Sequence, residues 1–145
     1  MCRRWWPILA ALWLLESVRF FAAGTVTTTA QIVYPGLTKY TMTWMADASG
    51  VVSGHIAAIK PGYLVAAKVV PSTVTAPTAL YDVTVVDVDV IDILNGLAAN
   101  QSATVGAYFA FQPPLFFDGS QSLDLQITNA GNAGKGVVYL WVQTR

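Results

Sequence analysis

The chain has 145 residues, a length that suits one domain with a single hydrophobic core. Hydrophobic residues make up 54% of the chain and charged residues only 11%, and eight Lys and Arg balance eight Asp and Glu. Without net charge there is no long-range field to attract phosphate backbones or anionic lipid, so we expect neither nucleic acid nor a membrane as the partner.

The first 24 residues differ in character from the rest of the chain. Two arginines precede an apolar run from Trp5 to Leu15, and Glu16 and Arg19 then interrupt the sequence before the small residues 22–24. A basic start, an apolar run of about 11 residues and a small-residue exit resemble a secretory signal, but the two charges argue against cleavage there. The run is also shorter than the roughly 20 apolar residues of a transmembrane helix.

We interpret residues 1–24 as an apolar arm, or a short helix, that docks on a protein surface. Aromatic side chains are costly to leave in water, because each presents roughly 150–250 Å² of surface. A signal or membrane anchor and a misassigned gene start are the alternatives for this segment. The candidate partner-binding residues of the arm are Trp5, Trp6, Trp13, Phe20 and Phe21.

From Thr25 onward the apolar residues recur with a period of two. Residues 39–44 are apolar at even positions and residues 123–128 at odd positions, so each run predicts a strand with one buried face. Residues 137–142 are apolar at every position, which predicts a central or covered strand. We therefore place Trp44 and Trp141 in the core.

The remaining runs complete the prediction of an all-β fold. Residues 81–90 alternate but change phase after Val85, which predicts a β-bulge or a bend within the strand. Eight or nine short strands separated by turns predict a single antiparallel β-sandwich over residues 25–145, with a jelly-roll-like topology. Open sheet edges favour self-association, so we expect a homodimer paired through an edge strand. Further strands are predicted at residues 26–33, 51–59, 63–70 and 103–111, and a short helical turn near 91–97.

Residues that carry chemistry are few. Cys2 is the single cysteine and His55 the single histidine, so a disulfide within the chain, a Cys-based zinc site and Ser-His-Asp or Cys-His catalysis each lack a necessary part. The absence of disulfides favours assembly in a reducing cytosol. We therefore predict no catalytic residue, no metal and no cofactor, and a protein that is not an enzyme.

Asp87, Asp89 and Asp92 form the densest carboxylate cluster. Their spacing lacks the glycine and glutamate positions of an EF-hand calcium loop. The simplest interpretation of Asp87 and Asp89 is the solvated side of a strand, where like charges discourage stray pairing. Whether the cluster holds a cation stays open.

A second apolar segment lies at residues 113–117. Its two prolines exclude a central strand, while its large apolar side chains favour burial. We interpret it as a loop that either folds inward or contacts another protein. In the second case Pro113, Pro114, Phe116 and Phe117 join the candidate partner-binding residues.

Three stretches resemble small head-associated proteins of tailed phages and prophages: YTMTW at 40–44, PTALYDVTV at 77–85 and NAGNAGKGVV at 129–138. The resemblance spans residues 38–142. It implies a cement, or decoration, protein that is assembled in the host cytoplasm and sits on the outer capsid surface of the virion. Such a protein bridges major capsid subunits, stabilises the head and often forms a symmetric oligomer.

An alternative function is an exported β-sandwich adhesin or carbohydrate-binding module with a cleaved signal peptide. It predicts an aromatic platform on the surface, for which Trp44 and Trp141 are unsuited if they lie in the core. The phage resemblance carries no catalytic motif, so no functional residue follows from it.

Overall fold

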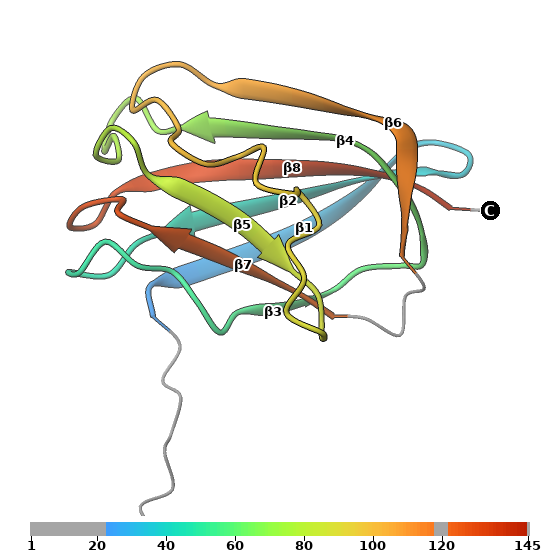
Figure 1. The fold of residues 1–145 in the computed structure, drawn as a ribbon, viewed down its shortest axis with the longest axis horizontal. Coiled ribbons are helices and arrows are strands. Elements are labelled where there is room, and N and C mark those ends of the chain that lie inside the picture. Colours follow the sequence, from blue (N-terminus) through green and yellow to red (C-terminus); the bar gives the residue numbers. More distant parts are fainter. Residues whose placement is uncertain (1–22, 118–121, 145) are drawn as a thin grey trace, which may run out of the picture.

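In the computed structural model, which describes residues 23–117 and 122–144, two antiparallel β-sheets pack face to face (Figure 1). This confirms the predicted β-sandwich. The described residues contain no helix, so the helical turn predicted near 91–97 is wrong, and that segment forms non-helical turns. The strands are β1 (Thr25–Tyr34), β2 (Leu37–Met45), β3 (Ile56–Ala58), β4 (Gly62–Pro71), β5 (Asp82–Val86), β6 (Ala107–Phe117), β7 (Ser122–Thr128) and β8 (Lys135–Gln143).

The order of the strands gives the sandwich a jelly-roll topology. One sheet has five strands in the order β1-β2-β8-β4-β6, and the other has three in the order β3-β7-β5. From β2 to β8 every connection passes from one sheet to the other, and only the β1–β2 hairpin stays within a sheet. This alternation wraps the chain around a single core. Of the predicted arm, only residues 23 and 24 lie within the described residues.

The buried faces follow the predicted alternation. In β2 the inward positions are Tyr40, Met42 and Trp44, whereas Thr43 faces outward. Each apolar side chain removed from water contributes about 1.5–3 kcal/mol to folding, which fixes the inward face of the strand. The opposite sheet supplies a matching set from β7, namely Leu123, Leu125 and Ile127.

Trp44 occupies its place in the core because the neighbouring strand has a glycine opposite it. Gly136 of β8 pairs with Trp44 in the β2–β8 register. A Cβ atom at position 136 would lie 2.6 Å from Cζ2 of the indole, closer than non-bonded atoms approach. The indole also packs against Tyr81, with ring centroids 5.8 Å apart. Gly136 therefore makes room for the largest side chain of the core.

The placement of Trp141 in the core is wrong. Leu140 and Val142 take the inward positions of β8, so Trp141 lies half-buried on the outer face of the five-stranded sheet. The strand is central, between β2 and β4, as predicted. Its outer residues are apolar nevertheless, and among the described residues no second layer covers them.

The change of phase after Val85 marks the end of a strand and not a bulge within it. β5 ends at Val86, and the chain turns there because Asp87 Oδ1 accepts hydrogen bonds from the N–H groups of Asp89 (3.0 Å) and Ile91 (2.9 Å). Asp87 and Asp89 are therefore turn residues and do not line the solvated side of a strand.

Replacing Trp44 with alanine should lower the free energy of unfolding by about 3–5 kcal/mol, because the lost side chain leaves a cavity in the core. The control Trp141→Ala removes the same side chain from the outer face, where it is half-buried, and should cost much less. Urea unfolding of the two variants measures the difference. Equal losses would contradict the opposite placements of the two indoles.

Tyr81 should make stability depend on pH in the alkaline range. Its buried hydroxyl has no hydrogen-bond partner among the described residues, and burial raises the pKa of Tyr81 from 10.0 to about 12. The unfolded chain releases this proton near pH 10 and the folded chain near pH 12, so stability falls as the pH rises through that window. Tyr81→Phe should weaken this fall without lowering stability at neutral pH, since it removes an unpaired buried hydroxyl. Urea unfolding at neutral and alkaline pH tests both points, and an unchanged alkaline fall in Tyr81→Phe would refute the assignment.

Candidate protein-contact surface

The segment predicted as a loop at residues 113–117 is part of the edge strand β6, so that prediction is corrected. An edge strand tolerates Pro113 and Pro114 because it donates hydrogen bonds on one side only. The pairing with β4 skips from Ala110 to Leu115, so the residues between them bulge out of the ladder. Figure 1 shows β6 bending sharply at one end of the sandwich. Phe117 ends the strand, paired with Gly62.

The segment faces solvent and does not fold inward. Pro113 and Pro114 are exposed, and Phe116 keeps 59% of its side chain accessible. Leu115 is 40% exposed. Of the two interpretations that the sequence allowed, exposure favours a contact with another protein.

Phe116 belongs to a row of residues that crosses the whole five-stranded sheet. The strand registers pair neighbouring members of this row directly, so their side chains share the outer face of the sheet. Most of them are aromatic or aliphatic, and Tyr34 at the far end is 70% exposed. We call this set the terminal row; from β1 to β6 it consists of Tyr34, Leu37, Gln143, Tyr63 and Phe116.

Tyr63 stands between two hollows in this surface. Its ring packs on Phe116, with centroids 5.2 Å apart and a tilt of 55°. A hollow of about 310 Å³ lies on the side of Pro61 and Gly62, and another of about 430 Å³ is lined by Tyr63, Pro113, Pro114, Gln143 and Thr144. Among the described residues, no carboxylate, lysine or histidine lines either hollow. Both are therefore suited to apolar side chains of a partner.

A second group of aromatic side chains lies further along the same face. Trp141 contacts Tyr139 at 5.9 Å and Tyr108 at 6.2 Å between ring centroids. Lys39 places its Nζ 5.8 Å from the ring centroid of Tyr139, a cation–π distance. The outer face of the five-stranded sheet thus carries aromatic groups at its end and at its middle.

Lysine and aspartate side chains are distributed unequally between the sheets. Lys39 and Lys68 lie on strands of the five-stranded sheet, whereas Asp82 and Asp124 lie on strands of the three-stranded sheet. The acidic cluster of Asp87, Asp89 and Asp92 follows β5 in the connection after Val86. The face that bears the terminal row is therefore apolar and weakly basic, which favours a partner surface without a strong positive charge.

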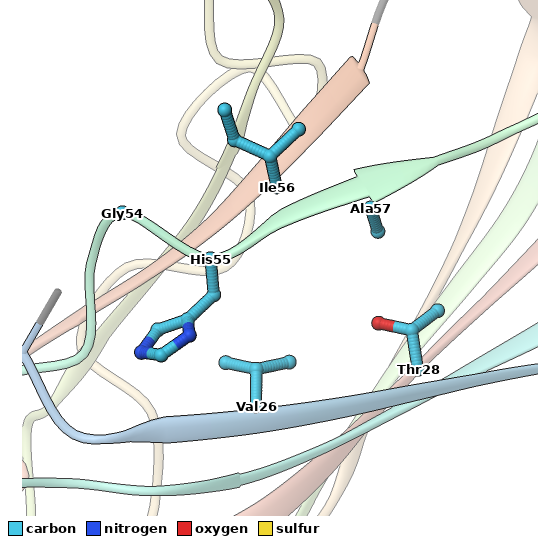
Figure 2. A pocket seen from close by; sticks show the side chains of 6 residues that line it. All are labelled: Val26, Thr28, Gly54, His55, Ile56 and Ala57. Carbon is cyan, nitrogen blue, oxygen red and sulfur yellow. The ribbon is translucent and has the colours of Figure 1, made fainter.

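His55 has a structural role at the opposite side of the molecule. Its Nε2 lies 3.1 Å from the carbonyl oxygens of both Ala23 and Gly24, and because carbonyls only accept, this nitrogen carries the hydrogen. Asp124 accepts from the backbone N–H of His55 at 2.7 Å and of Gly54 at 3.1 Å. These bonds tie the start of β1 to β3, and the side chains between them line a hollow of about 310 Å³ (Figure 2).

Within the carboxylate cluster, Asp87 and Asp92 bind backbone N–H groups. Asp92 Oδ1 accepts from the N–H of Val85 and Leu94, and its Oδ2 accepts from the N–H of Gly96 at 2.8 Å. Within residues 23–117 and 122–144, no group of three or more His, Cys, Asp or Glu side chains is placed to hold a metal ion. Asp87 and Asp92 therefore act as turn residues that shape the connection after β5.

The structure brings together only part of the predicted set of contact residues. Pro113, Pro114 and Phe116 lie around Tyr63, whereas the arm residues Trp5, Trp6, Trp13, Phe20 and Phe21 lie outside the described residues. Sequence reasoning missed Tyr63, because residues 63–70 are apolar on both faces and hide which face each side chain takes. Tyr34 was missed because the predicted strand stops at residue 33, whereas β1 extends to Tyr34.

No protein family, curated protein or solved structure matches the chain. In the part of the chain that the structure describes, no helix is long and apolar enough to cross a bilayer. The function of the surface is therefore inferred from its own chemistry.

Proposed function

We propose that the chain is a structural protein of a phage virion that binds the outer surface of the capsid, bridges major capsid subunits and stabilises the head. The observation that carries this proposal is the terminal row with its two hollows around Tyr63. Its described residues carry no charged side chain, and Tyr34 and Phe116 are largely exposed. The resemblance of residues 38–142 to phage head proteins points in the same direction.

The chemistry of the terminal row suits a partner protein better than a small polar ligand. Phe116 and Tyr63 form an aromatic pair at the centre of the surface, and hollows lie on both sides of it. Aromatic anchors next to pockets commonly dominate the binding energy of protein interfaces. A loop of a capsid subunit that inserts one apolar side chain into each hollow would desolvate the pair.

A stable interface needs more area than this row supplies. Specific protein interfaces bury about 1,200 Å² or more in total. Pro113, Pro114 and Leu115 extend the surface along β6. The aromatic arm over residues 1–24, with its three tryptophans, is proposed to add a second contact with the capsid.

Phe116→Ser should weaken binding to capsids of the encoding phage by about 30-fold or more, since the loss of an aromatic anchor typically costs 2 kcal/mol or more. Its control is Val74→Ser, which removes an apolar side chain that is 93% exposed beyond the other end of β4. Co-sedimentation with capsids lacking the protein measures occupancy, and thermal unfolding confirms that both variants stay folded.

Binding that is equal in Phe116→Ser and Val74→Ser would refute the role of the terminal row. A third variant with Trp5, Trp6 and Trp13 all changed to Ser tests the arm in the same assay. Loss of binding in this variant alone would place the capsid contact on the arm. Failure of the unaltered chain to bind capsids would overturn the proposed function itself.

Carbohydrate binding by an exported module is the second candidate function, and the position of Trp141 favours it. Because Trp141 lies on the outer face together with Tyr108 and Tyr139, the sheet offers aromatic rings that a sugar can stack on. The rings are mutually tilted by 61° and 34°, so they do not form one flat platform. This geometry ranks the sugar-binding function below the capsid-binding function.

A sugar site at Trp141 should show itself in the fluorescence of the indole. Titration of the chain with soluble fragments of bacterial surface polysaccharide is expected to leave the emission unchanged. Saturable quenching that is lost in Trp141→Ala, with Tyr34→Ala as the control, would support the carbohydrate-binding module over the capsid protein.

A further inference from the structure

The two sheets have four edges, and three of them are protected against pairing with another chain. β6 carries two prolines and a bulge, and β3 has only three residues. The edge of β5 is covered by the connection that follows it, through bonds such as Ile93 N–H to the Val85 carbonyl at 2.8 Å and Val83 N–H to the Ala98 carbonyl at 2.9 Å. Prolines, short strands and covering loops are the devices by which natural sheets avoid edge-to-edge association.

Among the described residues, the fourth edge, β1, has none of these devices between Thr25 and Ile32, and its register with β2 shifts only at the end of the strand, between Ile32 and Tyr34. Its ten residues, TVTTTAQIVY, include no proline and no charged side chain. The strand pairs with β2 on one side only. In an antiparallel ladder, alternate residues direct their N–H and C=O groups to opposite sides, so about five residues of β1 present these groups at the open edge.

We propose that β1 pairs with β1 of a second copy of the chain, antiparallel and across a two-fold axis, so that the two five-stranded sheets become one continuous sheet. The strand suits a copy of itself because two uncharged edges meet without repulsion. Symmetric dimers of this kind are the commonest closed assemblies.

The hollow beside His55 indicates the register of the pair. Figure 2 shows Val26 and Thr28 of β1 pointing toward β3, with His55 and Ala57 pointing back at them. Further along β1, Ile32 lies on the same face of the strand as Val26 and Thr28, and yet it is 72% exposed. Each copy therefore has a hollow beside Val26, lined by polar as well as apolar groups, and an unburied isoleucine further along the same strand.

A two-fold axis at Thr29 brings these two features together. Residues whose numbers sum to 58 then lie opposite each other, so Val26 faces Ile32 of the partner subunit. Directly opposed residues of antiparallel strands point to the same face, and their Cβ atoms lie about 4.5–5.5 Å apart. The isoleucine of each copy thus lies against the hollow of the other copy. Because the contact occurs twice, both isoleucines become buried in the dimer.

This inference does not depend on what the terminal row binds, and its test measures association and not capsid binding. In a Cys2→Ser background, Thr29→Cys should form a disulfide-linked dimer under mild oxidation, since directly opposed residues have the Cα separation that a disulfide needs. The control Thr43→Cys lies exposed on β2, which is paired on both sides, and should stay unlinked.

Sedimentation equilibrium of the full chain gives the second measurement. The unaltered chain should be a dimer, and Thr29→Lys should weaken it at least about tenfold, because two ammonium groups meet at the axis. Thr43→Lys should leave the dimer intact. A monomeric unaltered chain, as expected if residues 1–22 cover the edge of β1, would overturn the proposal, as would a dimer that Thr29→Lys does not weaken.

Discussion

The unequal size of the two sheets is the constraint on which the rest of the structure depends. Three strands cannot cover five, so burial is complete only where β3, β7 and β5 lie above the larger sheet. There the inward positions are sealed, as at Met42 and Leu125, which are both 0% exposed. Towards the end of β1 the alternation continues without a covering layer, which leaves Ile32 apolar and exposed. The outer face of β8 points away from the three-stranded sheet and is in contact with solvent for that separate reason.

Where one face of a strand is polar, the sequence predicted the structure correctly. In β2 the threonines separate the large side chains, so the inward positions of Met42 and Trp44 were unambiguous. In β8 residues 137–142 are all apolar, and the pattern could not reveal that Trp141 points outward. The pairing of Trp44 with Gly136 fixes which alternate side chains of β8 point into the core, because the glycine must lie on the inward face.

The contact surface was predictable in part for a related reason. Pro113 and Pro114 indicated a segment that cannot form a central strand of a sheet, and its large apolar neighbours indicated a contact with another protein. The terminal row, however, joins residues from all five strands, and its members lie up to 109 positions apart, from Tyr34 to Gln143. Such a row depends on the registers, which a single sequence does not contain. Tyr63 therefore became visible as the centre of the surface only in the folded chain.

The open edge and the terminal row, taken together, suggest how a small sandwich can bridge two capsid subunits. A two-fold axis perpendicular to the joined sheet keeps the outer faces of both copies on the same side. It also places the two terminal rows at opposite ends of that face, since the two β1 strands run antiparallel. A dimer would thus present two identical apolar surfaces to one capsid surface. Binding at the first row raises the effective concentration of the second, so two weak contacts give firm attachment without any new interaction. The proposed self-pairing through β1 and the proposed capsid binding through Phe116 would in this way be two parts of one mechanism.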